Sequence, residues 1–152
     1  MKIRNVPATL LAASFAMTAM TTMAADGLIE VKSSLGPKEA MDKLEAAVKA
    51  RNLNVFARID HSAGAARVGK TLRPTELLIF GNPQGGTPLM ECAQSAGIDL
   101  PLKALVWVDA SGQTMIGYND PAYLAKRHGA TSCPVVEHLT KALTGIAQEA
   151  TK

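Results

Sequence analysis

The sequence contains no long charge run, no low-complexity tract and no internal repeat, and only 4% of its 152 residues are aromatic. Charged residues make up 19% of the chain and apolar residues 47%, so roughly half of the chain is available for a core. Disordered proteins lack this apolar content, and the length suits one domain. The composition therefore predicts a single globular domain and argues against a disordered protein and against a membrane channel or pump.

The first 25 residues have the layout of a cleavable signal peptide. Lys2 and Arg4 form a short basic start, residues 6–20 are apolar or small, and small residues follow. The apolar stretch is interrupted by polar residues and is short for a bilayer of about 30 Å, which favours cleavage over a retained anchor. We therefore expect residues 1–25 to be removed. Residues 26–152 then form one domain in the periplasm, with no integral membrane span.

The chain also lacks a basic stripe that could neutralise several phosphates, as nucleic-acid binding requires. Cleavage leaves 14 of the 16 basic residues against 13 acidic residues, a net charge of +1. The only local basic cluster is Arg67, Lys70 and Arg73, and a solvated loop face is its favoured interpretation. No nucleic-acid partner is expected.

The chain has two cysteines, Cys92 and Cys133, and no Cys-x-x-Cys motif. In an oxidising compartment a disulfide between them would persist and would close a loop of about 40 residues. Sequence spacing does not show whether their Cα atoms approach within about 7 Å, as a bridge requires. A disulfide, a pair of buried or free thiols, and a metal or redox role therefore remain open.

Hydrophobic periodicity predicts five strands and two long helices. Residues 28–33 and 53–60 alternate, with Leu53, Val55, Ala57 and Ile59 expected on one face, and residues 76–80 are a continuous apolar run typical of an interior strand covered on both faces. A turn at Ala110, Ser111 and Gly112 predicts a hairpin between residues 104–109 and 113–118. Apolar stripes predict long helices that begin at Pro37 and Pro134.

Two shorter helices are predicted between these elements. Thr87 is expected to cap a helix with Pro88 in its first turn and Ala96 at its end, and Asp120 to cap a helix that ends near His128. The fold class is therefore α+β: a mainly antiparallel sheet of about five strands with helices packed on one face, in the order β-α-β-β-β-β-α with short inserted helices.

Several motifs in a fixed order resemble a known bacterial family. They are FARIDH at 56–61, LRPTELLIFGNP at 72–83, GTPLM at 86–90, DLPLK at 99–103 and YNDP at 118–121. Together they are similar to the family catalogued as domain of unknown function 302, over nearly all of residues 28–128. The resemblance implies a small α+β fold of the TATA-binding-protein-like kind, and it brings no established reaction or cofactor. The segment from Thr131 onward and Cys92 lie outside the motifs that carry it.

Six residues near the ends of predicted strands form the candidate ligand site: His61, Asn82, Gly86, Thr87, Tyr118 and Asp120. In this hypothesis the His61 imidazole is a donor or acceptor that switches near neutral pH. Asn82 and the backbone amides of Gly86 and Thr87 hold a small anion at a helix start. Tyr118 and Asp120 fix its orientation.

Each candidate also has a structural interpretation. His61 is able to hold the following loop, the glycines to form a tight turn, and Asp120 to act only as a helix cap. The phosphate-binding lysine signature is absent. The favoured function is an exported module that binds a small molecule, a small anion or a partner chain, with sheet-edge pairing into a homodimer as a further expectation.

Two other functions are alternatives. Three histidines, the cysteines and the methionines include soft ligands for copper or zinc, but no His-x-His or Met-rich run supports a site. An enzyme or thiol-based function is the second alternative, with Cys133 at a helix start as the better thiolate candidate. No Gly-x-Ser-x-Gly motif is present.

Overall fold

The structure is a computed structural model that describes residues 25–152. The predicted signal peptide lies outside the described residues, apart from Ala25. The strands are β1 (Leu28–Ser33), β2 (Asn54–Asp60), β3 (Thr75–Gly81), β4 (Leu102–Val108) and β5 (Thr114–Asn119). The helices are α1 (Pro37–Ala50), α2 (His61–Arg67), α3 (Pro83–Cys92), the 3₁₀ helix η1 (Gln94–Ile98), α4 (Pro121–Arg127) and α5 (Val135–Glu149).

The five strands form one sheet in the order β1-β5-β4-β3-β2, and all neighbours are antiparallel. The predicted fold class is confirmed, including the hairpin between β4 and β5. Its connection runs from Asp109 to Gln113, and the Asp109 carboxylate accepts hydrogen bonds from the backbone N–H groups of Ser111 and Gln113. A hydrogen bond from the Ser111 hydroxyl, together with those from the two backbone N–H groups, lowers the pKa of Asp109.

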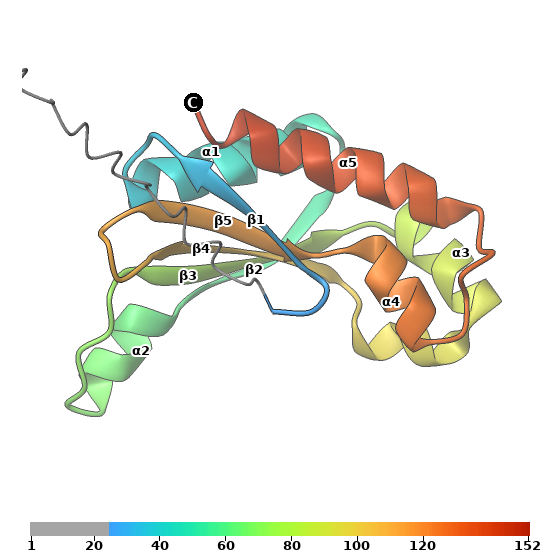
Figure 1. The fold of residues 1–152 in the computed structure, drawn as a ribbon, viewed down its shortest axis with the longest axis horizontal. Coiled ribbons are helices and arrows are strands. Elements are labelled where there is room, and N and C mark those ends of the chain that lie inside the picture. Colours follow the sequence, from blue (N-terminus) through green and yellow to red (C-terminus); the bar gives the residue numbers. More distant parts are fainter. Residues whose placement is uncertain (1–24) are drawn as a thin grey trace, which may run out of the picture.

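Helices α1 and α5 cover one face of the sheet (Figure 1). The predicted stripe of α1 is buried there in full: Ala40, Met41, Leu44, Ala47 and Val48. α5 adds Leu143, Ile146 and Ala147, so the segment after Gly129 packs onto the domain. Large side chains of the sheet, such as Leu78, Phe80 and Ile116, complete this main core.

The other face of the sheet differs from the prediction for residues 76–80. β3 is an interior strand, as expected, but Leu77 and Ile79 on its second face are only half-buried. In the register of β3 with β4, Leu77 lies opposite Leu105, so these neighbours shield one another without a covering helix.

A second difference from the prediction concerns β2, where a bulge interrupts the alternation of inward and outward residues. The register with β3 shifts between Val55 and Ala57, which makes Phe56 an extra residue. Val55 lies opposite Phe80, whereas Ala57 and Ile59 lie opposite Ile79 and Leu77 on the other face. The predicted common face of the alternating residues is therefore wrong from Ala57 onward, and Phe56 is left 57% exposed.

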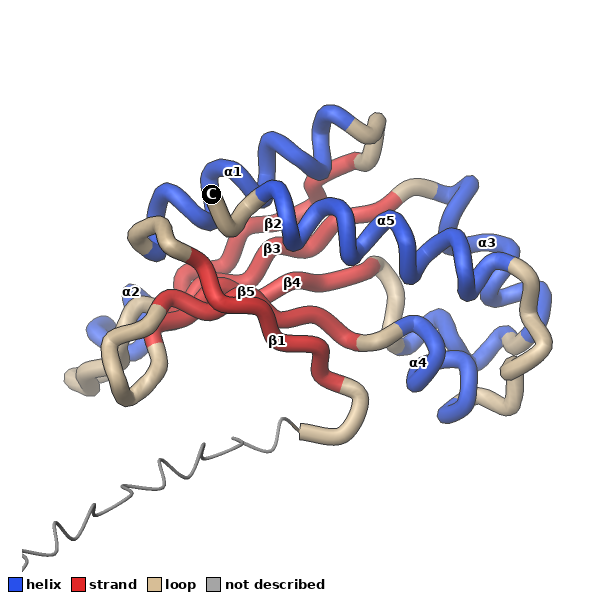
Figure 2. Tube along the Cα trace, turned by 45° about the horizontal axis from the view of Figure 1, so that its top comes forward, coloured by secondary structure: helices blue, strands red, loops and turns tan. Residues whose placement is uncertain are grey.

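At one end of the sheet, α3, η1, α4 and the start of α5 form a smaller unit (Figure 2). Its buried residues are Leu89, Ala96, Ala125, Ala130, Cys133 and Leu139. α4 begins and ends as predicted, and the Asp120 carboxylate accepts a hydrogen bond of 2.9 Å from the N–H of Ala122. Pro134 precedes α5 as its N-cap rather than opening it.

The start of α3 differs from the prediction. The helix begins at Pro83, with Asn82 as its cap, and it ends at Cys92. Gly85, Gly86 and Thr87 therefore lie inside the helix, and Pro88 lies in its middle rather than in its first turn. The Asn82 side chain accepts a hydrogen bond of 2.8 Å from the N–H of Gly85, which is the usual action of an N-cap. Two adjacent glycines favour a turn locally, but this cap and the packing of the helix outweigh that preference.

Candidate functional site

A pocket of about 920 Å³ lies where α3 faces α5. Its floor is formed by side chains of the main core, chiefly Phe80, Leu143 and Ile146. The first turns of α3 and the loop that leads into β4 form one wall, and α5 forms the other. Phe56, exposed because of the bulge, lies at the β2 side. The pocket is therefore an apolar hollow between the two parts of the molecule.

The polar lining residues come from three separate segments. They are Arg51, Asn82, Gln84, Thr87, His138 and Lys141. His138 and Lys141 are exposed, as are Gln84 and Thr87, whereas Arg51 and Asn82 are half-buried. An apolar floor below a few polar groups is the usual composition of a small-molecule site in proteins.

The two glycines of α3 give the wall its shape. A Cβ at Gly86 would lie 3.5 Å from Cδ1 of Leu100, and a Cβ at Gly85 would lie 3.5 Å from Cδ2 of Leu139. Both are ordinary van der Waals contacts, so neither glycine is required by the fold. Their absent side chains leave additional space in the pocket.

The predicted site residues fall into two groups. Asn82, Gly86 and Thr87 line this pocket, whereas His61, Tyr118 and Asp120 do not. The prediction that all six gather around one hollow is therefore wrong.

The position of His61 follows from the register of the sheet. Asp60 pairs with Glu76 at one end of β3, and Asn54 pairs with Gly81 at the other. Five residues of strand correspond to about 17 Å, so His61 and Asn82 lie at opposite ends of the sheet. His61 begins α2 and is exposed, and its side chain forms no hydrogen bond with residues 25–152.

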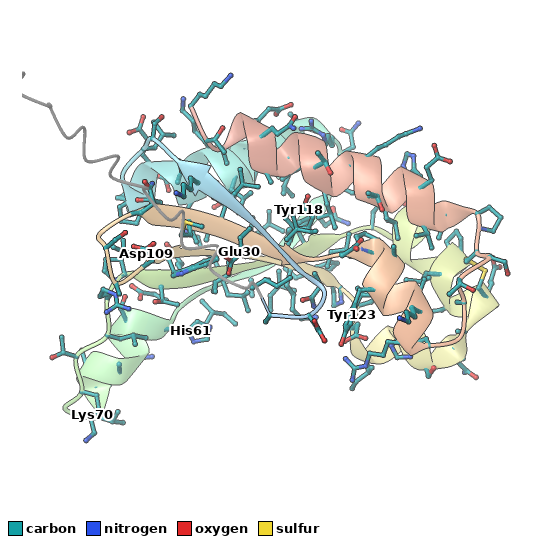
Figure 3. The ribbon with its side chains drawn as sticks, in the orientation of Figure 1. Glu30, His61, Lys70, Asp109, Tyr118 and Tyr123 are labelled. Atoms are coloured by element: carbon teal, nitrogen blue, oxygen red, sulfur yellow. A yellow bond between two sulfur atoms is a disulfide. The ribbon has the colours of Figure 1, made fainter. Side chains whose placement is uncertain are left out.

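Tyr118 lies in the main core and is only 5% exposed. Its hydroxyl is 3.2 Å from the hydroxyl of Thr144, so it joins β5 to α5 (Figure 3). Figure 3 also shows His61 at the start of α2, away from α5. Both Tyr118 and Asp120 thus have structural roles, in the core and at a helix cap.

The predicted anion site at the glycines is also wrong in its geometry. The N–H of Gly86 donates to the carbonyl oxygen of Asn82 at 3.1 Å, and the N–H of Gly85 donates to the Asn82 side chain. These amides are used within α3 because the helix begins before them. They are not free to receive an anion.

Sequence reasoning missed the basic side chains of the pocket. His138 entered only as one of the three histidines of the metal alternative, and Arg51 and Lys141 carried no motif. The available signal was the spacing in α5, where His138, Lys141 and Gly145 flank the apolar stripe at intervals of three and four residues. The Arg51 guanidinium forms hydrogen bonds of 2.6 and 2.9 Å with Glu149, which raise the pKa of Arg51 and lower that of Glu149.

A disulfide between Cys92 and Cys133 joins the two walls of the pocket. Their Cα atoms are 6.0 Å apart. Cys92 is the last residue of α3, and Cys133 lies just before α5. Of the alternatives that the sequence left open, the structure has the bridge, and no free thiolate exists at Cys133 in this state.

A polar cluster lies beyond the disulfide and connects η1 with α4. Nε2 of His128 is 2.6 Å from the Asp99 carboxylate, and its Nδ1 is 3.0 Å from the Ser95 hydroxyl. Arg127 also donates to Asp99, at 3.0 Å. Because the His128 side chain is only 7% exposed, these contacts fix the end of α4 against η1.

Among residues 25–152, neither a metal-ligand cluster nor a helix suited to span a membrane is found. Between residues 25 and 152, no three His, Cys, Asp or Glu side chains come together as a group that could hold a metal ion. Over the same residues, no helix has both the length and the apolar character needed to cross a bilayer.

Comparison with known proteins gives one family. The family model described as "Domain of unknown function DUF302" matches residues 29–148. A crystal structure of an uncharacterised conserved DUF302 protein from Bacillus stearothermophilus has the same fold, with a TM-score of 0.75 and 22% identity. The match covers 83% of this chain and 99% of that one.

Two curated relatives are longer proteins. A protein named fluoride-specific ion channel FluC 1, from Brucella suis biovar 1 (strain 1330), is 47% identical over 109 residues, which are 72% of this chain and 43% of that protein. The protein of the same name from Brucella abortus biovar 1 (strain 9-941) has the same identity, over 40% of its length. The chain thus spans less than half of these relatives.

Proposed function

Because this chain belongs to the DUF302 family, whose description assigns no function, we propose from its own geometry that the domain binds a small organic ligand in the pocket between α3 and α5. The main support for this proposal is the pocket itself. Its volume of about 920 Å³ lies within the range of about 300–1,000 Å³ that is usual for ligand sites.

The composition of the pocket supports an organic ligand with an apolar body. The floor consists of fully or almost fully buried residues such as Phe80, Leu143 and Ile146, whose packing in the main core keeps the site preformed. A ligand in the pocket removes from water the accessible apolar surface of half-buried lining residues such as Leu53, Met90 and Leu100, at about 25 cal/mol per Å². The polar residues at the rim then select and orient it.

We propose further that the domain acts outside the cytoplasm, in the periplasm. The N-terminal sequence has the layout of a signal peptide, and a disulfide persists in an oxidising compartment. The test is to express the full chain with its native N-terminus in a Gram-negative host and to determine the mature mass from the periplasmic fraction. Loss of about 25 residues and of two hydrogens, for the bridge, is expected. A full-length protein in the cytoplasm contradicts this proposal.

The sheet-edge homodimer stays a prediction, and the two edges are not equivalent. β2 carries the bulge at Phe56, and bulges protect an edge against pairing. The regular strand β1 is therefore the edge that we propose for it.

The test of the pocket uses the fluorescent probe 8-anilinonaphthalene-1-sulfonate and the variant Ala142→Phe. Ala142 lies on α5 and lines the pocket, so a phenyl ring there fills it. The matched control is Ala122→Phe, at an exposed position of α4 outside the pocket. We expect saturable binding by the wild-type protein and the control, and at least about tenfold weaker binding by Ala142→Phe.

One further variant tests whether the fluorescent probe binds outside the pocket, on the open face of the sheet. Ile59 lies on the open face of the sheet and is 39% exposed, so Ile59→Lys removes apolar surface there. If Ile59→Lys abolishes probe binding and Ala142→Phe leaves it intact, the probe occupies the sheet face and the pocket proposal is wrong.

A further inference from the structure

The titratable residues that line the pocket are all basic: Arg51, His138 and Lys141. Among residues 25–152, no Asp or Glu lines it. Building on the proposed ligand function, we propose that the ligand is an anionic amphipath, a single-chain carboxylate whose apolar chain lies on the floor and whose head group lies among these basic side chains.

Two of the basic groups, His138 and Lys141, lie in a row along α5. Lys141 follows His138 by three residues, and Gly145 follows Lys141 by four, so all three positions lie on one side of the helix. Arg51 extends this row, although it belongs to the end of α1. A Cβ built on Gly145 would lie 3.0 Å from Nη2 of Arg51, which places the guanidinium directly over that glycine. The row is therefore continuous across two helices.

Two carboxylates outside the pocket contact this row: Glu137 is paired with Lys141, and Glu149 with Arg51. Glu137 is 2.6 Å from Nζ of Lys141, but the two side chains are 77% and 75% exposed. Such a surface pair contributes about 0–1 kcal/mol, so Lys141 exchanges it readily for a ligand carboxylate.

Arg51 retains hydrogen-bonding capacity despite its ion pair. Nη1 donates to Glu149 and to the carbonyl oxygen of Ala47, and Nη2 donates once to Glu149. A guanidinium has five N–H groups, so Nε–H and one N–H of Nη2 have no partner among residues 25–152. An anionic head group near Gly145 therefore finds a fixed, oriented donor.

The apolar side of the site suits a flexible chain. The half-buried residues Leu53, Met90 and Leu100 provide accessible apolar surface in the pocket, and no buried side-chain N or O atom among residues 25–152 lacks a hydrogen-bond partner. Phe56, 57% exposed at the rim, adds apolar surface towards solvent. A hydrocarbon chain covers these residues without leaving a polar group unsatisfied.

The test compares three compounds that share one chain and differ in the charge of the head group. Dodecanoate, dodecanol and dodecyltrimethylammonium are titrated by calorimetry below the concentrations at which they aggregate. We expect dodecanoate to bind at least about tenfold more tightly than dodecanol, because hydrogen bonds to charged groups add that much, and the cation to bind most weakly.

Variants then locate the head group. The double variant His138→Gln with Lys141→Gln removes two members of the row and keeps Arg51 and the apolar floor, and we expect its affinity for dodecanoate to fall at least about threefold towards that for dodecanol. The matched control is Lys126→Gln, an exposed position of α4 that does not line the pocket. Circular dichroism melting curves confirm that each variant is folded.

The outcomes separate the two proposals. Equal binding of dodecanoate and dodecanol, with both lost in Ala142→Phe, overturns the anionic head group and leaves the ligand pocket standing. The proposed preference for an anionic head group is likewise overturned if Lys126→Gln weakens the binding of dodecanoate as much as the double variant does. Failure of all three compounds and of the fluorescent probe to bind overturns the pocket function itself.

Discussion

The main core and the end unit are stabilised in different ways. The main core buries large side chains between the sheet and the helices α1 and α5, including Met41, Leu44 and Phe80. In the end unit, formed by α3, η1 and α4, half of the buried cluster consists of alanines. That unit is cross-linked instead, by the disulfide and by the hydrogen bonds of His128.

This contrast explains where the pocket lies. Leu143 and Ile146 on its floor belong to the main core, whereas Leu139 belongs to the cluster of the end unit. The pocket therefore lies where the two buried clusters meet. This position also means that changes in α3 alter the pocket without unfolding the sheet.

The largest expected effect comes from the main core. Leu44 is completely buried on α1, so Leu44→Ala leaves a cavity and lowers the free energy of unfolding by about 3–5 kcal/mol. Denaturant unfolding followed by circular dichroism measures this loss. We expect the whole sheet to unfold in a single transition. A change below about 1 kcal/mol would show that the main core does not dominate stability.

The disulfide is expected to have the next largest effect. Cys92 and Cys133 are separated by 41 positions in the sequence. The double variant to Ser removes the constraint that the bridge places on the unfolded chain, so we expect the free energy of unfolding to fall by about 2–4 kcal/mol. Hydrogen exchange measured residue by residue distinguishes the two regions. We expect faster exchange first in α3 and η1, with β3 and β4 still protected. Uniform acceleration over the whole chain contradicts the division into two units.

A smaller effect concerns pH and a group of charges at the main core. Arg58 on β2 donates to Asp42 at 2.7 Å, to Glu45 at 3.2 Å and to Glu76. Hydrogen bonds from Lys38 and Arg58 hold the pKa of Asp42 below its usual value, and those from Lys49 and Arg58 do the same for Glu45. Because the folded-state pKa values are lowered, this stabilisation is present above pH 5 and is lost as the pH falls through them.

The variant Arg58→Gln tests this origin of the pH dependence. We expect it to lower stability by about 1 kcal/mol at pH 7, since Asp42 is exposed and Glu45 and Glu76 are only half-buried. We also expect a shallower loss of stability between pH 5 and pH 3 than in the wild type, measured by denaturant unfolding at each pH. An unchanged slope would assign the acid sensitivity to other groups.

The smallest expected effect is a gain in stability at the pocket. Gly86 lies inside α3, and its added methyl group would be in ordinary contact with Leu100, so Gly86→Ala stabilises the helix by about 0.5–1 kcal/mol. The same methyl group narrows the pocket, and weaker binding of the fluorescent probe should accompany the higher melting temperature. Destabilisation by Gly86→Ala would mean that the glycine is required for the fold.

Elements with a strong local pattern were predictable from the sequence. The five buried positions of α1 follow the helical period, and the turn between β4 and β5 has the composition of a hairpin. Asp120 followed by Pro121 marks the start of α4 for the same local reason. The motifs between residues 56 and 121 also placed the chain in its family, which the match over residues 29–148 confirms.

Elements that depend on competing local preferences were not predictable. Gly85 and Gly86 favour a turn, yet they lie in α3 because Asn82 caps the helix before them. The alternation of β2 gives no sign of the bulge at Phe56, which appears only when the strand is paired with β3. His61 was lost from the candidate site for a similar reason, because strand register placed it at the far end of the sheet from Asn82.

The sequence by itself determined the fold class, because helical and strand periods are properties of neighbouring residues and survive without knowledge of the rest of the chain. The tertiary structure alone decided the pocket, the bridge between Cys92 and Cys133, and the row of basic groups that joins Arg51 to Lys141. The bridge joins residues 41 positions apart, and Arg51 and Lys141 are 90 positions apart, so these features depend on how the elements pack rather than on any local pattern.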